Sequence, residues 1–136
     1  MSEENLETAR RAWEASNERP KPDFATVNAL YHADHELVAV TDTLEGGTRH
    51  GAQGFREWLA EIEHAFGSWT SRVEEVKAID DERVLLLWVG TFTGKQSGAG
   101  AEQRGGAVLI FKDGKISRTE VYPSVEEARK ALGLSE

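Results

Sequence analysis

The second half of the chain contains the stretch VLLLWVGTFTGKQSGAGAEQRGGAVLIFKDGKISRTEVY, residues 84–122. Apolar segments of strand length alternate in it with turn residues: a Gly- and Ser-rich tip at Gly94–Gly100 and the tight-turn pair Asp113-Gly114. This pattern predicts an antiparallel meander. Its three predicted strands are Val84–Thr93, Ala101–Phe111 and Ile116–Tyr122.

Before this stretch, helical patterns dominate. Phe55, Trp58, Leu59, Ile62 and Phe66 lie at i, i+3, i+4, i+7 and i+11, which predicts a helix with one buried face. The other predicted elements are helices from Ser2 to about Glu18 and from Asp23 to Tyr31, a strand His35–Thr41, a loop Asp42–Gly51, a strand Trp69–Ile79, and a terminal helix capped by Ser124.

This order of elements decides the fold class. Helices are grouped early and strands late, which is typical of α+β proteins rather than of βαβ units. Gly90, Gly94, Gly105 and Gly106 interrupt strong strand patterns, and glycines at such places mark bends. We therefore expect a single domain over residues 1–136, in which a strongly curved, mainly antiparallel sheet is covered by three N-terminal helices and encloses a hollow.

Composition excludes several classes of function. The 136 residues include 16 Lys and Arg, 24 Asp and Glu, and no Cys, giving a formal net charge of −8. The absence of Cys excludes a disulfide scaffold, thiol catalysis and thiolate zinc sites. The acidic balance argues against nucleic acid as a partner, because a phosphate backbone requires a field of Lys and Arg.

Targeting signals are not recognisable. No apolar run approaches the roughly 20 residues of a membrane-spanning helix, so we expect no membrane partner. The start Met1–Asn5 is acidic and polar, unlike a signal or transit peptide. A cytoplasmic location is the resulting prediction.

Five short motifs occur in an order and spacing that together are specific for one fold. They are Leu30-Tyr31-His32-Ala33-Asp34, His50-Gly51-Ala52-Gln53-Gly54-Phe55, Gly94-Lys95-Gln96-Ser97-Gly98, the run from Phe111 to Tyr122, and the acidic last helix with Ala128. On these residues the chain resembles the nuclear-transport-factor-2-like (NTF2-like) superfamily, and within it the SnoaL-like branch. The resemblance covers nearly the whole chain.

The resemblance implies a conical, cystatin-like or SnoaL-like α+β domain with a deep pocket, forming a homodimer through the outer face of its sheet. The superfamily includes ketosteroid isomerases, polyketide cyclases, scytalone dehydratase, limonene epoxide hydrolase and non-catalytic binding domains. It implies chemistry without a cofactor if the chain is an enzyme. Many SnoaL-like proteins carry Asp after the tyrosine of the last strand, but Pro123-Ser124 stands here instead.

Glu120 is the first candidate for a general acid or base, because burial in an apolar pocket raises a carboxylate pKa toward neutrality. Strand side chains alternate with period two, so Ile116, Arg118, Glu120 and Tyr122 are predicted to share a face. If this face lines the pocket, Arg118 and Glu120 form a polar cluster on its wall. The alternative is an ion pair on the outer face or rim, with Arg104 as a further partner.

Three further side chains are candidates for chemistry. Tyr31 and Tyr122 could donate hydrogen bonds to a carbonyl or enolate oxygen, or simply anchor their hydroxyls to neighbours. His50 stands at the start of the third helix, where it could serve as a base or lie in a solvent-facing loop.

Aromatic residues are candidates for the pocket lining. Trp13 and Trp88 are predicted to line the hollow together with Phe55, Arg104 and Arg118, unless the aromatic rings close the hollow entirely.

A metal or nucleotide site is not predicted. His32, Asp34, His35 and Glu36 are metal-capable, but they straddle a helix-to-strand change, and a closed site would need a converging third ligand. The Gly-rich tip lacks the Lys-Ser/Thr of a phosphate loop.

The predicted function is binding of a small apolar molecule, with its conversion left open. The alternative is a non-catalytic dimeric ligand-binding or interaction domain.

Overall fold

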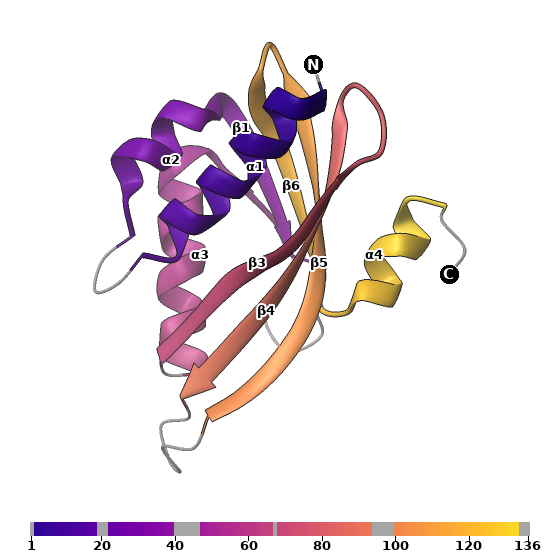
Figure 1. Ribbon diagram of the computed structural model, residues 1–136. Helices are drawn as coiled ribbons and strands as arrows, with labels where there is room; N and C mark the ends of the chain where they lie inside the picture. Colours follow the sequence, from indigo (N-terminus) through magenta and orange to yellow (C-terminus); the bar gives the residue numbers. More distant parts are fainter. Residues whose placement is uncertain (1, 19–21, 40–46, 67, 94–99, 134–136) are drawn as a thin grey trace.

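The computed structural model describes residues 2–18, 22–39, 47–66, 68–93 and 100–133. Within these ranges, six strands form a curved, unclosed sheet in the order β2-β1-β6-β5-β4-β3 (Figure 1). All neighbours pair antiparallel except β1 and β6, which are parallel. The elements are α1 (Ser2–Ser16), α2 (Phe24–Leu30), β1 (Tyr31–Ala39), β2 (Gly47–His50), α3 (Gly51–Phe66), β3 (Ser68–Ala78), β4 (Arg83–Thr93), β5 (Gly100–Lys112), β6 (Lys115–Tyr122) and α4 (Val125–Ala131).

Helices cover both faces of the sheet. The first three, α1 to α3, lie on one face, which we call the inner face, and α4 lies on the opposite, outer face (Figure 1). This arrangement confirms the predicted α+β class and the curved sheet under three N-terminal helices. None of the helices in the described part of the chain combines the length and apolar character needed to cross a membrane.

Two short helices begin at the predicted caps. The Asp23 carboxylate accepts a hydrogen bond from the Thr26 amide at 3.2 Å, and the hydrogen bonds from Thr26 hold the pKa of Asp23 below its usual value. The Ser124 hydroxyl accepts from the Glu127 amide at 3.1 Å. Both helices have only seven residues, so their stability depends on docking against the sheet.

The main core lies between the inner face and α1 to α3. The rings of Trp13 and Trp88 stack in it with centroids 6.4 Å apart. Trp88 covers Gly105 on the neighbouring strand so closely that a side chain there has no space. Fully buried aliphatic members of this core are Val27, Leu37, Val84, Leu86, Leu109 and Ile116.

A smaller apolar cluster joins α4 to the outer face. Ala128 packs against Leu85 and Leu87 of β4, with Tyr122 at its margin. A Cβ on Gly106 would lie 2.6 Å from the Ala128 Cβ, so the glycine is what lets α4 approach the sheet.

The structure corrects the sequence-based assignment in two places. Residues 47–50, predicted as part of a loop, form the edge strand β2, and β1 begins at Tyr31 rather than at His35. Residues 94–99 of the predicted tip, residues 42–46 of the predicted loop and the last two residues, 40–41, of the predicted strand lie outside the described residues. The early start of β1 matters for function because it places Tyr31 and His35 on one strand.

A β-bulge in β6 overturns the predicted common face. Ile110 and Phe111 of β5 pair with Arg118 and Ile116, which leaves Ser117 unpaired. Such an extra residue shifts the alternation of side chains by one position. Ile116 therefore belongs to the main core, whereas Arg118 and the alternate residues after it lie on the outer face.

Candidate functional site

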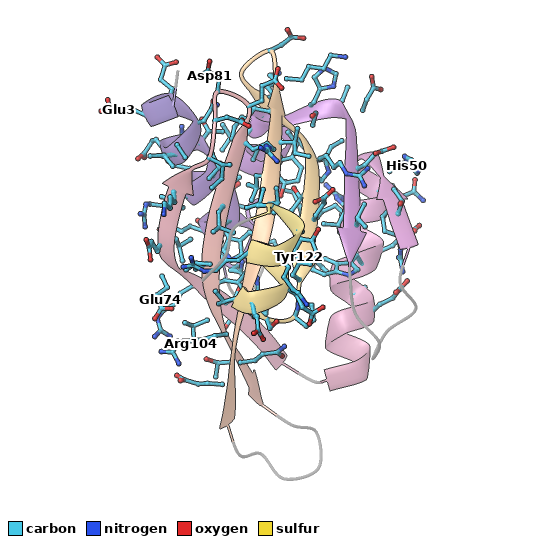
Figure 2. The ribbon with its side chains drawn as sticks, turned by 90° about the vertical axis from the view of Figure 1, so that its right-hand side faces the viewer. Glu3, His50, Glu74, Asp81, Arg104 and Tyr122 are labelled. Atoms are coloured by element: carbon cyan, nitrogen blue, oxygen red, sulfur yellow. The ribbon has the colours of Figure 1, made fainter. Side chains whose placement is uncertain are left out.

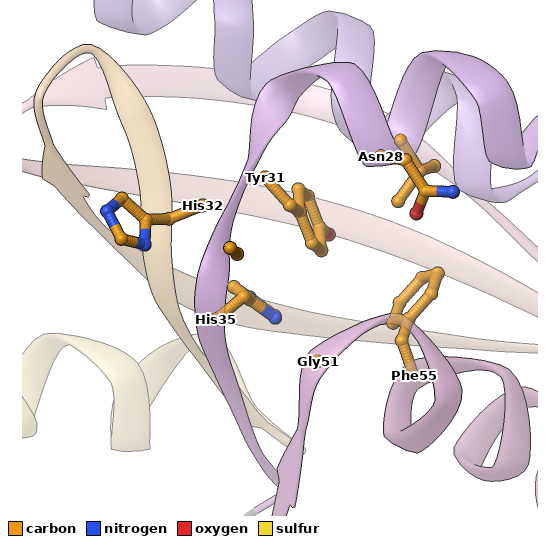
Figure 3. A pocket seen from close by; sticks show the side chains of 8 residues that line it. Asn28, Tyr31, His32, His35, Gly51 and Phe55 are labelled. Atoms are coloured by element: carbon orange, nitrogen blue, oxygen red, sulfur yellow. The ribbon is translucent and has the colours of Figure 1, made fainter.

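A cavity of about 190 Å³ opens on the inner side of the sheet, where α2, β1 and the start of α3 meet. Figure 3 shows Tyr31 and His35 projecting from the same side of β1 toward Gly51 and Phe55, with His32 on the opposite side of the strand. Its lining residues are Val27, Asn28, Tyr31, His32, Ala33, His35, Gly51 and Phe55. The cavity therefore combines apolar walls with a few polar groups.

A second, narrower space lies deeper, against the inner face. It has a volume of about 20 Å³, enough for about one water molecule. Its lining residues are Trp13, Ser16, Asn17, Tyr31, Leu37, Phe55, Trp58, Leu59, Thr119 and Val121. Tyr31 and Phe55 line both spaces and form an edge-to-face pair with centroids 5.6 Å apart, so they separate the outer cavity from the inner pocket.

Tyr31 is the predicted candidate that the structure places in the site. Burial raises the pKa of its hydroxyl to about 12, and hydrogen bonding with the side chains of Ser16 and Thr119 partly offsets that effect. The hydroxyl thus stays protonated near neutral pH. It meets the first requirement of a hydrogen-bond donor to a ligand oxygen.

His35 is the functional candidate that the sequence interpretation considered only as a metal ligand. Its side chain is 1% exposed, and its ring lies 4.1 Å from the Tyr31 ring, centroid to centroid. Its Nε2 is 2.8 Å from the Thr119 hydroxyl, whereas its Nδ1 has no hydrogen-bond partner among the described residues. Burial lowers the pKa of His35 to about 4, so the ring is neutral at pH 7.

Hydrogen bonds fix the end of α1 that forms the inner wall. The indole of Trp13 donates to the Ser71 hydroxyl at 2.9 Å. Asn17 accepts from the Ser71 amide at 2.8 Å and donates to the Trp13 carbonyl at the same distance. The bonds to Ser71 attach the end of α1 to β3, and the indole N–H is used there, so Trp13 contributes a rigid apolar wall.

Aromatic rings of α2 and α3 surround Phe55, which lines both spaces. Phe55 contacts Phe24 edge to face with centroids 6.4 Å apart, and the Phe55 and Trp58 centroids are separated by the same distance. The Arg56 guanidinium lies 4.3 Å from the centre of the Phe24 ring, in cation–π geometry. These contacts hold Phe55, a predicted pocket residue, in place.

Four predicted site residues lie on the outer face instead. Arg118 donates to Glu36 at 2.7 Å and to Glu120 at 2.8 Å, and Tyr122 donates to Glu120 at 3.1 Å. The bond to Glu120 is the main cause of a raised Arg118 pKa, and burial followed by the Glu120 charge raises the pKa of Tyr122 to about 12. His50 lies 3.8 Å from Glu36 at the end of this chain.

The outer-face position corrects the predicted pocket lining. Arg118, Glu120, Tyr122 and His50 line neither cavity. Arg104 is on the outer side too, where it forms an exposed ion pair with Glu74 at 3.4 Å (Figure 2). The alternative of an outer-face ion pair is therefore the one observed for Arg118 and Glu120, although Arg104 pairs with Glu74 and not with Glu120.

Trp88, the remaining predicted pocket residue, is packed in the main core and lines neither cavity. No group of three or more His, Asp or Glu residues in the described part of the chain gathers closely enough to hold a metal ion.

Thr119 was not singled out from the sequence. Its position two residues before Val121, on the face opposite Glu120, becomes recognisable only when the bulge at Ser117 is known.

Comparisons with known proteins agree with this architecture. The family model described as SnoaL-like domain matches residues 9–119. TerC, in its structure with polyporic acid, is similar with a TM-score of 0.76 and 20% identity, over 96% of this chain and 98% of that one. No curated protein matches the chain.

Two further solved structures share the fold. An NTF2-like protein of unknown function from Burkholderia pseudomallei has a TM-score of 0.75 and 21% identity, over 93% of this chain and 95% of that one. An uncharacterised cystatin-fold protein from Novosphingobium aromaticivorans has a TM-score of 0.64 and 25% identity, over 89% and 97%. These matches confirm the resemblance inferred from the motifs.

Proposed function

The chain belongs to the SnoaL-like domain family, and we propose that it binds a small molecule with a single ring and a polar substituent in the cavity beside Tyr31 and His35. The observation that carries this proposal is a cavity of about 190 Å³ whose apolar walls surround the buried side chain of His35 and the partly buried side chain of Tyr31. An apolar cavity of about 150 Å³ accepts benzene. The available space therefore suits one ring.

The lining favours a mixed ligand. Val27 and Phe55 offer an apolar surface for a ring, while the polar groups of Tyr31 and His35 can orient a substituent. A protein with a similar fold has been crystallised with polyporic acid, which supports a small organic molecule as the ligand class.

Single-ring probes such as phenol, benzyl alcohol and cyclohexanone test the proposal in a thermal unfolding assay. At ten times its dissociation constant, a ligand that binds only the folded state is expected to raise the melting temperature by about 4 °C. Asn28→Trp, at an exposed position on the rim of the cavity, is expected to reduce that shift without lowering the melting temperature of the free protein. Asn28→Ala serves as the matched control. No shift with any ring probe would contradict the proposal.

Conversion of the ligand without a cofactor is the second candidate function. It is supported by the protonated Tyr31 hydroxyl, which would polarise a carbonyl oxygen that replaces Ser16 as the acceptor of its proton. Incubation of the protein with ring ketones, followed by proton NMR for loss of the starting compound, distinguishes conversion from binding. Glu120, Tyr122 and His50 have no role in the ligand site under this proposal.

Self-association through the outer face of the sheet stays a prediction from the family resemblance. Light scattering at micromolar concentration is expected to give twice the 15.0 kDa of the chain. A mass of one chain at that concentration would reject the dimer and leave the ligand proposal intact, because both cavities are built within one chain.

A further inference from the structure

A line of hydroxyl groups connects α1 to His35. The Ser16 hydroxyl donates to the Ala12 carbonyl at 2.8 Å, and since a carbonyl can only accept, the Ser16 proton is used there. Tyr31 hydrogen-bonds with both Ser16 and Thr119. It must donate to Ser16, and it therefore accepts from Thr119. Because the single Thr119 proton is then used, the contact of 2.8 Å between Thr119 and His35 requires a proton on His35 Nε2.

This direction of donation fixes the tautomer of the imidazole. A neutral ring with its proton on Nε2 carries a lone pair on Nδ1. That atom has no partner among the described residues, and its side chain, which is 1% exposed, is one of those that line the cavity. Figure 3 shows the ring directed into the space beside Tyr31 and Phe55. A buried acceptor without a donor is costly, and a ligand can remove this cost.

The polar side chains of His32 and Asn28 at the cavity do not provide a second buried hydrogen-bond acceptor. Nδ1 of His32 already accepts from the Asp34 amide at 3.1 Å, and Asn28 is exposed at the rim. His35 is thus the buried acceptor of the site.

We propose that His35 Nδ1 accepts a hydrogen bond from the ligand, which is therefore a ring compound bearing an O–H or N–H donor, such as a phenol, an enol, a ring alcohol or a ring amine. This inference rests on the proposed function and narrows it from a polar substituent to a donor. A ligand whose polar atom only accepts, such as an ether oxygen, leaves Nδ1 unpaired.

Phenol and fluorobenzene test the inference with the unaltered protein, because they have nearly the same size and only phenol has a donor. NMR titration is expected to show phenol binding roughly 3- to 10-fold more tightly than fluorobenzene. In His35→Leu the preference is expected to disappear while fluorobenzene still binds. Equal affinity for the two compounds in the unaltered protein overturns the inference alone, whereas no binding of either overturns the proposed function and the inference with it.

The tautomer provides a readout that does not depend on affinity. In protein with ¹⁵N-labelled histidine at pH 7.5, His35 is expected to show a protonated Nε2 and an unprotonated Nδ1, and the Nδ1 resonance is expected to move when phenol is added. A proton on Nδ1 in the free protein overturns the inference, as does an Nδ1 resonance that phenol leaves unchanged at saturation.

Discussion

Gly105→Ala is expected to lower the free energy of unfolding by about 3 kcal/mol, at the upper end of the usual cost of overpacking. A Cβ built on Gly105 collides with Cζ2 of Trp88 and lies 2.6 Å from its Cε2. The ring cannot retreat, because it is 4% exposed and stacks on Trp13. Urea unfolding followed by tryptophan fluorescence measures the loss.

The control for this prediction removes the obstacle. Trp88→Phe takes away the six-membered part of the indole, which contains the Cζ2 atom nearest to the new methyl group. In that background Gly105→Ala is expected to cost less than about 1 kcal/mol, so the two substitutions should couple strongly. An equal cost in both backgrounds would show that the glycine serves backbone geometry rather than the ring.

The fold could be predicted because its signals are periodic and span many residues. The stripe beginning at Phe55 and Trp58 specified α3, and the run Val84–Thr93 specified a central strand. Caps at Asp23 and Ser124 marked the starts of short helices correctly. Each signal rests on repeated burial of apolar surface, which local irregularities do not erase.

The site was harder to predict because two single-residue irregularities decide it. The bulge at Ser117 moves Arg118 and Glu120 to the outer face and gives the inner position to Thr119. A register shift between Tyr31 and Glu36 determines in the same way which side chains of β1 enter the cavity. Neither irregularity can be recognised from the two-residue alternation of side chains in the sequence. The residue type was therefore enough to select Tyr31 as a candidate, whereas the role of His35 was not predicted.

Acidification from pH 7 to pH 5 is expected to reduce the free energy of unfolding by about 2 kcal/mol, because of His35. Burial lowers the pKa of this side chain to about 4 in the folded protein, against an ordinary value of 6.5 in the unfolded chain. Between these values the unfolded chain binds the proton and the folded protein does not. The contribution of neutral His35 to the free energy of unfolding is therefore complete above pH 6.5, declines as the pH falls and reaches its minimum below pH 4.

This window separates His35 from the other titrating groups near it. Tyr31 has a pKa of about 12, and carboxylates with lowered pKa values, such as Asp23 and Asp80, protonate below the window. Urea unfolding of His35→Leu is expected to give nearly the same free energy at pH 7 and pH 5, whereas His50→Gln, which alters an exposed imidazole, is expected to keep the full difference. If His35→Leu keeps the difference in the free energy of unfolding between pH 7 and pH 5, the titrating group lies elsewhere, because this variant has no imidazole at that position to bind a proton.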